Sequence, residues 1–526
     1  TRKVENRMTI TDTAPAHAET PPWKGLNTRS SGLLMHITSL PSPYGIGTMG
    51  AEARNYIDFL HAAGQRWWQI LPICPTGYGD SPYQSFSTFA GNPYLIDLDD
   101  LAADGLLNQT EYAHLDWGSS PLSVDYGLLY RQRFSVLRLA CARLRANPPA
   151  EFPVFCNQNA FWLEDYALFM ALKEVHHGAP WSEWDPSLRE RNHLALARAR
   201  QSLVQDVIFW KCVQFLFFRQ WNALKAYASR SGVGFIGDLP IYVSGDSVDV
   251  WAQPEQFQLD GARQPIEVAG CPPDGFSADG QLWGNPLFDW DFMESDGFRW
   301  WIRRIDYQCR IYDVLRIDHF RGFDSYYAIP HGASTAQKGR WRQGPGLRLF
   351  QAVEAALGPR PILAEDLGFL TPSVHRLRED TGFPGMKVLQ FAFDSRDGSG
   401  SVYLPHSYPR NCVAYVGTHD NDTALGWLEH AAPEDVAYAR EYLHLDPAEG
   451  AWGLLRAVWA SVADTAILQM QDVLCLGSES RMNTPSTVGH NWQWRAAPGF
   501  NCPELAARLR RETELYGRLS AASEHP

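Results

Sequence analysis

The stretch Val314-Leu315-Arg316-Ile317-Asp318 decides the fold, because it is an apolar strand that ends abruptly on a carboxylate. The same pattern recurs where short apolar runs end at Asp238, Glu365 and Asp420. Acids form strands poorly and are costly to bury, so their recurrence at strand ends needs a common cause. In a barrel of parallel strands every carboxyl end opens onto the face that carries the chemistry. The pattern predicts carboxylate catalysis on a neutral substrate, with glycosidic bonds as the leading candidate.

The alternation of side chains along this strand places Val314, Arg316 and Asp318 on one face. If that face is the barrel interior, Arg316 lies beside Asp318. A guanidinium there would hold the carboxylate ionised and oriented, as a nucleophile requires. A purely structural Arg–Asp pair at the mouth of a barrel is the alternative, since structural ion pairs also perturb such groups.

Eight candidate strands follow one another along the chain, over residues 32–40, 66–73, 233–243, 312–318, 361–366, 386–393, 412–420 and 466–474. The first two flank a helix expected over residues 51–63, which makes a parallel crossover. We therefore predict an α/β protein with a (β/α)8 TIM barrel. It should carry a large helical insertion between strands two and three and long loop insertions at the carboxyl face.

The expected organisation is a flexible tail over 1–22, a catalytic barrel formed by 23–95 and 206–526, and a mainly helical insertion over 96–205. Helical periodicity supports the insertion over residues 126–145, 160–175 and 194–229, the last of which continues into the barrel helix. Residues 246–291 are rich in Gly, Pro, Asp and Trp and show no clear periodicity. So long a loop is usually functional, and we expect it to form an active-site insertion with a lid.

Composition places the chain among ordinary soluble globular proteins. Of its 526 residues, 45% are hydrophobic and 20% charged, enough for a sizeable core. A net charge of −13 argues against nucleic acid as a partner. No apolar run is long enough to cross a membrane, and the amino end has no signal-peptide stretch. The nine scattered cysteines lack any C-x-x-C pair, so we expect reduced thiols and a cytoplasmic location.

The segment 45–50 fits the G-x-G-x-x-G pattern of dinucleotide-binding proteins. A nucleotide fold needs the first glycine at the edge of a strand and an acid at the end of the next strand. Here 41–44 intervenes, and the second strand ends in Leu71-Pro72-Ile73-Cys74. A tight loop at a helix start is the better interpretation. The sequence also lacks the H-E-x-x-H, EF-hand, P-loop and G-x-S-x-G patterns.

Two acids stand together after the strand at 361–366, and spacing alone leaves the choice between them open. Glu365 could be a proton donor, because glutamate has the longer reach and its pKa is easily raised by its surroundings. Asp366 could instead be the active acid, with Glu365 supporting it. In the polar run 417–423, a helix cap is expected of its last two residues. His419 and Asp420 remain the functional candidates there.

Aromatic and amide side chains cluster on two loops that should lie at the same end of the barrel. Tyr83 and Gln84 lie on one loop, and Trp283 and Asn285 on the other. Sugars need both kinds of group, since they offer an apolar ring face and hydroxyls. A loop tryptophan that merely caps a core gives the same pattern, so each of these residues is a weak signal when taken singly.

Taken in order, the segments resemble the amylomaltase family, which comprises the 4-α-glucanotransferases or disproportionating enzymes of the α-amylase clan. The matching segments are 42–47, 81–84, 237–243, 283–286, 315–322, 364–368, 417–423 and 481–483, and the resemblance covers nearly the whole chain from Gly32 to Arg495. The resemblance implies a (β/α)8 barrel without a metal or organic cofactor. It also implies retaining transfer of α-1,4-glucan segments from a donor to an acceptor glucan, with a hydrolase of the same clan as the alternative.

On the matching positions the nucleophile would be Asp318, the acid/base Glu365 and the transition-state stabiliser Asp420. Residues expected to contact or position substrate are Tyr83, Asp238, Phe276, Trp283, Asn285, Arg316, His319, His419 and Asn483. One departure concerns the lid. Family members often have a tyrosine before Phe276, where this chain has Gly275. The change to glycine adds backbone freedom. It puts in question how the lid binds the acceptor sugar and which product length is preferred, but not the reaction class.

Overall fold

A computed structural model describes residues 26–273, 278–368, 370–396 and 400–519. The tail expected over 1–22 and the lid residues Gly275 and Phe276 lie outside these ranges.

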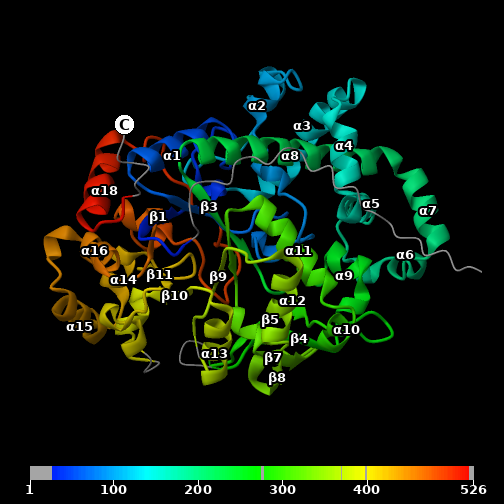
Figure 1. The fold of residues 1–526 in the computed structure, drawn as a ribbon. Helices are drawn as coiled ribbons and strands as arrows, with labels where there is room; N and C mark the ends of the chain where they lie inside the picture. The colour runs from blue at the N-terminus through cyan, green and yellow to red at the C-terminus, as the bar shows by residue number, and fades with distance from the viewer. Residues whose placement is uncertain (1–25, 274–277, 369, 397–399, 520–526) are drawn as a thin grey trace, which may run out of the picture.

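Within the described residues, the core is an eight-stranded parallel sheet in the order β10-β11-β12-β1-β2-β3-β6-β9 (Figure 1). Its strands are β1 (Ser30–Leu34), β2 (Trp67–Gln69), β3 (Gly234–Leu239), β6 (Val314–Ile317), β9 (Ile362–Ala364), β10 (Gly385–Val388), β11 (Cys412–Tyr415) and β12 (Thr465–Gln469). The backbone N–H of Ala364 donates to the carbonyl of Pro384 at 2.9 Å, which joins β9 to the chain entering β10. The sheet thus closes on itself, and the predicted (β/α)8 barrel is confirmed.

Helices connect successive strands of the barrel, and two more, α17 and α18, follow the last strand. They are α1 (Ala51–Ala62), α8 (Val204–Arg230), α11 (Arg299–Ile311), α12 (Leu347–Leu357), α13 (Pro372–Thr381), α14 (Ala424–His430), α15 (Pro433–Leu443), α16 (Trp452–Ala460), α17 (Met470–Val473) and α18 (Pro503–Leu515). The first shows why they form. Ala53, Tyr56, Ile57 and Leu60 recur at helical spacing and are fully buried, whereas Asn55 and Asp58 are exposed.

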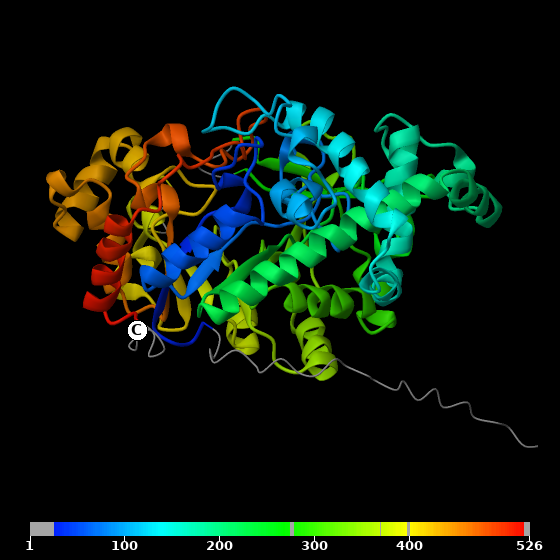
Figure 2. The same ribbon diagram turned by 90° about the horizontal axis from the view of Figure 1, so that it is seen from above.

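A group of helices lies between β2 and β3 and gathers on one side of the molecule (Figure 2). They are α2 (Leu98–Ala103), α3 (Tyr126–Ala146), α4 (Glu151–Gln158), α5 (Ala160–Val175), α6 (Pro186–Arg189) and α7 (His193–Ser202). Several of them, α3 and α5 above all, pack against α8, the long helix that leads into β3. The helical run expected over 194–229 is divided at Leu203, where α7 ends and α8 begins.

The described chain also contains a four-stranded antiparallel sheet, in the order β5-β4-β7-β8, that the sequence did not predict. Its strands are β4 (Glu267–Cys271), β5 (Gln281–Pro286), β7 (Ser325–Pro330) and β8 (Arg340–Gln343). The expectation of a loop over 246–291 is wrong to that extent, since this segment holds β4, β5, α9 (Val248–Ala252) and the start of α10 (Trp290–Ser295). β4 pairs with β7, more than fifty residues away along the chain, so no local pattern marks it.

Several strands are shorter than the apolar runs from which they were predicted. The run 466–474 is a strand only as far as Gln469, after which its buried residues continue as α17. The run 386–393 leaves the sheet at Val388 and forms a 3-10 turn. A run of buried residues is thus not all strand, because a buried turn shows the same composition.

The glycines of the segment 45–50 are explained by close packing at the start of α1. A Cβ on Gly47 would lie 2.0 Å from the carbonyl oxygen of Ile37, and one on Gly50 would lie 2.1 Å from Asp97 Oδ2. This is the tight loop that the sequence predicted. No helix in the described part of the chain is both long enough and apolar enough to cross a membrane.

Candidate active site

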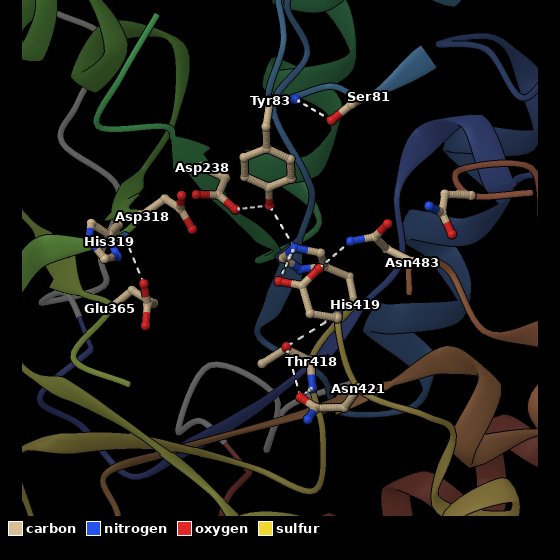
Figure 3. A network of polar contacts seen from close by, with 12 residues as sticks. Ser81, Tyr83, Asp238, Asp318, His319, Glu365, Thr418, His419, Asn421 and Asn483 are labelled. Carbon is tan, nitrogen blue, oxygen red and sulfur yellow. Dashed lines mark hydrogen bonds and ion pairs between the residues drawn. The ribbon is translucent and has the colours of Figure 1, made fainter. Parts of the chain in front are cut away.

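The four strand-end acids meet at the carboxyl end of the barrel, as the sequence predicted. Figure 3 shows three of them, Asp238, Asp318 and Glu365. Asp238 is the fifth residue of β3, Asp318 and Glu365 directly follow β6 and β9, and Asp420 lies in the turn after β11. β3, β6 and β9 are neighbours in the sheet. Their carboxyl ends therefore bring Asp238, Asp318 and Glu365 close together without any help from the loops.

Arg316 connects two of these acids. Its Nη1 lies 2.6 Å from Oδ2 of Asp238 and 3.1 Å from Oδ1 of Asp318. The Arg316 and Asp238 side chains are almost wholly buried, whereas 28% of the Asp318 side chain is exposed. Strand alternation predicted this neighbourhood. One buried cation balances two carboxylates, of which only Asp318 is open to a substrate.

Glu365 is held by the backbone, with both carboxylate oxygens engaged. Oε2 accepts from the N–H of His319 at 2.7 Å, and Oε1 accepts from the N–H of Leu367 at 2.9 Å. The first bond depends on His319, which has left-handed backbone angles (φ 50°, ψ 48°). Such a conformation is uncommon outside glycine. Here it turns the chain after Asp318 toward Glu365.

The Asp366 side chain points away from the other acids, toward Met386 and Arg378. Its Oδ1 accepts from the N–H of Met386 at 2.7 Å, and its Oδ2 lies 3.1 Å from Nε of Arg378. Both partners lie beyond β9, on β10 and α13. The geometry favours Glu365 over Asp366, since Glu365 lies at the cluster whereas Asp366 joins β9 to its neighbours.

The cluster retains a proton more readily than free carboxylic acids would. Burial raises the pKa of Asp318 well above its usual range, and Arg316 opposes the shift. Burial also raises the pKa of Glu365, against the same guanidinium and the two backbone N–H groups. The two acids interact, so they titrate as a pair. Arg316 is in direct contact with Asp318, so the guanidinium stabilises the negative charge on Asp318.

Tyr83 links the Arg316 pair to His419. The Tyr83 hydroxyl donates to Asp238 Oδ2 at 2.7 Å and lies 2.9 Å from Nε2 of His419. Burial lowers the pKa of His419, so its ring is neutral and carries one proton. The hydroxyl has only one hydrogen, and it is committed to Asp238. The second contact therefore requires His419 to donate from Nε2, which assigns its tautomer.

Asp420 is the most exposed of the four acids, with 46% of its side chain accessible. Its Oδ2 lies 3.4 Å from His419 Nε2, and its Oδ1 accepts from the side-chain amide of Asn483 at 2.6 Å. Arg481 donates to the carbonyls of both Asp420 and Asn483. The Asn483 amide thus orients an otherwise open carboxylate. The segment 481–483 that suggested the family resemblance lies directly beside Asp420.

The remaining predicted contacts differ in position. The ring of Trp283 meets that of His319 edge-on, with 4.8 Å between centroids, so both lie beside Asp318. Asn285 is buried, and its amide donates to the carbonyl of Val243 at 2.8 Å and lies against Gln84. That amide therefore braces two loops in this structure. Phe276 lies outside the described residues.

Sequence reasoning missed Trp492, whose ring lies 5.8 Å from that of Tyr83 and 6.0 Å from that of His419. It comes from a loop near the carboxyl end of the chain that has no periodicity. The pair Trp492 and Trp494 in an otherwise polar stretch was the available signal. Among the described residues, no group of three His, Cys, Asp or Glu side chains is arranged to hold a metal ion.

Comparison with known proteins gives a consistent result. A family profile described as 4-alpha-glucanotransferase matches residues 35–500. The chain is 50% identical to the 4-alpha-glucanotransferase of Thermus thermophilus, over 93% of this chain and 99% of that protein. It is 47% identical to that of Clostridium butyricum, over 92% of this chain and 100% of the other. The solved amylomaltase of Streptococcus agalactiae, in complex with acarbose, is similar with a TM-score of 0.91 and 44% identity, over 94% of this chain and 100% of that one.

Proposed function

The chain belongs to the 4-alpha-glucanotransferase family, and we propose that it transfers α-1,4-glucan segments by a retaining double displacement at Asp318, Glu365 and Asp420. The single observation that carries this assignment of residues is the contact of Arg316 with Asp318 beside the backbone-held Glu365. It places a carboxylate that a guanidinium orients beside a second carboxyl whose pKa is raised by burial. A retaining mechanism needs this pair.

In the first half of the reaction, a carboxylate oxygen of Asp318 attacks the anomeric carbon of the donor glucan. The bond to the glycosidic oxygen breaks, and Glu365 delivers its proton to that oxygen. The reducing-end part of the donor leaves with a new hydroxyl, and the remainder is bound covalently to Asp318. Positive charge develops on the sugar ring in the transition state. The exposed carboxylate of Asp420, oriented by Asn483, is placed to stabilise that charge.

In the second half, Glu365 has lost its proton and acts as a base. It accepts the proton of a 4-hydroxyl on the acceptor glucan as that oxygen attacks the anomeric carbon. The bond to Asp318 breaks, and both acids return to their starting states. We assign Tyr83, His419 and Trp283 to sugar binding, because they offer hydrogen-bonding groups and an aromatic face beside the acids. A contact of Asp238 with sugar stays a prediction, since its side chain is buried against Arg316. His319, Asn285 and Phe276 stay predictions in this respect.

We infer that donor and acceptor are maltooligosaccharides, starch, glycogen or glucose, since a neutral polyol suits a cluster of acids, amides and rings. We place the enzyme in the cytoplasm or a comparably reducing compartment. The support is that all nine cysteines are free thiols, which accords with a reducing environment.

Incubation with maltotriose alone tests the proposal. The enzyme should release glucose and build a ladder of longer maltooligosaccharides. The number of reducing ends should stay nearly constant, because each bond that breaks is replaced by one that forms. A rise in reducing ends that matches the release of glucose would show that water is the acceptor, and the hydrolase alternative would then replace the transferase.

A further inference from the structure

A small internal cavity borders His419 in the interior of the barrel. Its polar lining comes from His36, Ser39, His419, Gln469 and Gln471, and Leu34 and Met482 are among its apolar walls. The cavity has a volume of about 10 Å³, which is the space that one water molecule needs. Both histidines are nearly inaccessible from outside, so whatever the cavity holds is shielded from bulk solvent.

Hydrogen bonding assigns the proton of His36. Its Nδ1 accepts from the backbone N–H of Leu71 at 3.2 Å. Burial lowers the pKa of His36 to about 3, and the ring is neutral at ordinary pH. Because Nδ1 acts as an acceptor, the single ring proton must lie on Nε2. His36 therefore carries one donor that the described protein atoms leave without a partner.

Gln469 supplies a second donor. It ends β12 and is 2% exposed, and its Nε2 is buried with no protein partner among the described residues. A buried donor without a partner costs free energy unless water satisfies it. The third group is Nδ1 of His419. Since His419 donates from Nε2 to Tyr83, its Nδ1 is unprotonated and needs a donor.

We propose that one buried water in this cavity accepts hydrogen bonds from Nε2 of His36 and Nε2 of Gln469 and donates one to Nδ1 of His419. Three partners are the usual number for a buried water. His36 is then a positioning residue that acts on the site through His419. The water stabilises the tautomer of His419 with its proton on Nε2, the atom 3.4 Å from Asp420 Oδ2.

The consequence for catalysis rests on the proposed function. With the opposite tautomer, Nε2 would present a lone pair to the Asp420 carboxylate and the Tyr83 oxygen. That arrangement would repel Asp420 and remove a donor from the sugar site. The water thus keeps the donor directed at the substrate side of the ring.

Two substitutions of His36 separate its contact with the water from its contact with the backbone N–H of Leu71. In His36→Asn the amide oxygen can replace Nδ1 as the acceptor for Leu71, but no donor reaches the position of Nε2. In His36→Gln an N–H can reach that position, while the acceptor for Leu71 is lost. We expect His36→Asn to keep the melting temperature and lose the His419 tautomer. We expect His36→Gln to have a lower melting temperature and to keep the His419 tautomer.

The readout is the pair of ring ¹⁵N shifts of His419 in protein labelled at histidine, recorded without substrate and assigned with a His419→Asn variant. The wild type should show a single tautomer with its proton on Nε2. His36→Asn should show a mixture and a transfer rate lower by about tenfold, the cost of one ordinary hydrogen bond. Because the spectrum needs no turnover, it tests this inference even if the proposed function fails.

A folded His36→Asn protein with an unchanged tautomer would overturn the inference, whatever its activity. So would an activity loss of equal size in both variants with no change in the spectrum, which would mark a purely structural role. If His36→Asn does not fold, the Gln469→Leu variant and a high-resolution crystal structure of the wild type test the inference instead. Density for a water within hydrogen-bond reach of both histidines supports the proposal, and a dry cavity refutes it.

Discussion

The backbone N–H of His319 donates a hydrogen bond to the Glu365 carboxylate, with 2.7 Å between the nitrogen and Oε2. The residue that follows the proposed nucleophile therefore holds the proposed acid. The donor belongs to the backbone, so it stays in place when the His319 side chain is changed, and a glutamine at position 365 keeps an oxygen that can accept from it. The reacting acids can accordingly be substituted one at a time without loss of the frame that positions them.

Asp318→Asn should abolish transfer while preserving the fold, because the change is nearly isosteric and the side chain lies at the barrel mouth. We expect a loss of at least about 10³-fold in kcat, by analogy with the removal of nucleophiles in other enzymes. Release of glucose from maltotriose measures it, with the melting temperature as the control. Near-normal turnover by the folded variant would exclude Asp318 as the nucleophile.

Glu365→Gln should depend on the leaving group. With an α-glucosyl fluoride donor, protonation of the leaving group is barely needed, so Asp318 can still be glycosylated. Breakdown of the adduct then stalls because no base activates the acceptor. Mass spectrometry of the quenched protein should find the sugar on the peptide that contains Asp318. An adduct on the peptide with Asp420 or Asp238 would show that the nucleophile is wrongly assigned.

Asp366→Asn provides the matched comparison, since it changes the neighbouring acid. It removes the charge that faces Arg378 and weakens the link from β9 to β10. We expect a loss of stability on the order of 1–3 kcal/mol with the chemical step largely kept, because the side chain points away from the substrate. Denaturant unfolding and the burst of adduct formation measure the two effects. A selective loss of chemistry at full stability would make Asp366 the acid.

Tyr83→Phe tests the chain of hydrogen bonds from Asp238 to His419. The phenylalanine ring keeps the stacking on His419, while the hydroxyl that accepts from Nε2 is lost. We expect transfer to fall by about ten- to a hundredfold at nearly unchanged stability. Tyr415→Phe is the control, since that hydroxyl donates to Gln69 inside the barrel. A larger effect of the control on transfer would contradict the assignment.

The sequence predicts the barrel and its acids for one physical reason. An acid at the end of a buried strand is so costly that it has to be explained, and parallel strands put their ends on one face. Asp238, Asp318 and Glu365 follow directly from that rule. The choice between Glu365 and Asp366 did not, because two adjacent residues differ only in the direction of their side chains, and that direction depends on Arg378 and Met386.

The parts that were missed depend on long-range pairing. β4 pairs with the distant β7 as well as with β5, and Trp492 is placed beside Tyr83 by a loop without periodicity. Asn285 stays a prediction for a related reason. Its amide was expected to contact sugar, and in the structure the amide donates a hydrogen bond to the carbonyl of Val243. A short polar motif on a loop does not reveal whether its side chain faces the site or the protein behind it.

A last prediction concerns Asp472, which is fully buried on α17. Its Oδ1 accepts from the N–H of Ala424 at 2.6 Å, whereas its Oδ2 is buried without a partner among the described residues. Burial raises the pKa of Asp472 to about 7, and the neighbouring Asp422 adds to the shift. The protonated acid is therefore the form that the fold prefers, and ionisation at this position destabilises the native state.

The sign of the pH dependence follows from the direction of the shift. A carboxyl whose pKa is higher in the folded than in the unfolded protein contributes stability at low pH. That contribution is complete below the unfolded pKa near 3.8 and is lost as pH rises through about 7. Asp472→Asn keeps an acceptor for Ala424 and cannot ionise. Its advantage over the wild type should grow from pH 5 to pH 8 and reach on the order of 2 kcal/mol. Denaturant unfolding across that range measures it, and a constant difference between the two proteins would show that Asp472 does not titrate there.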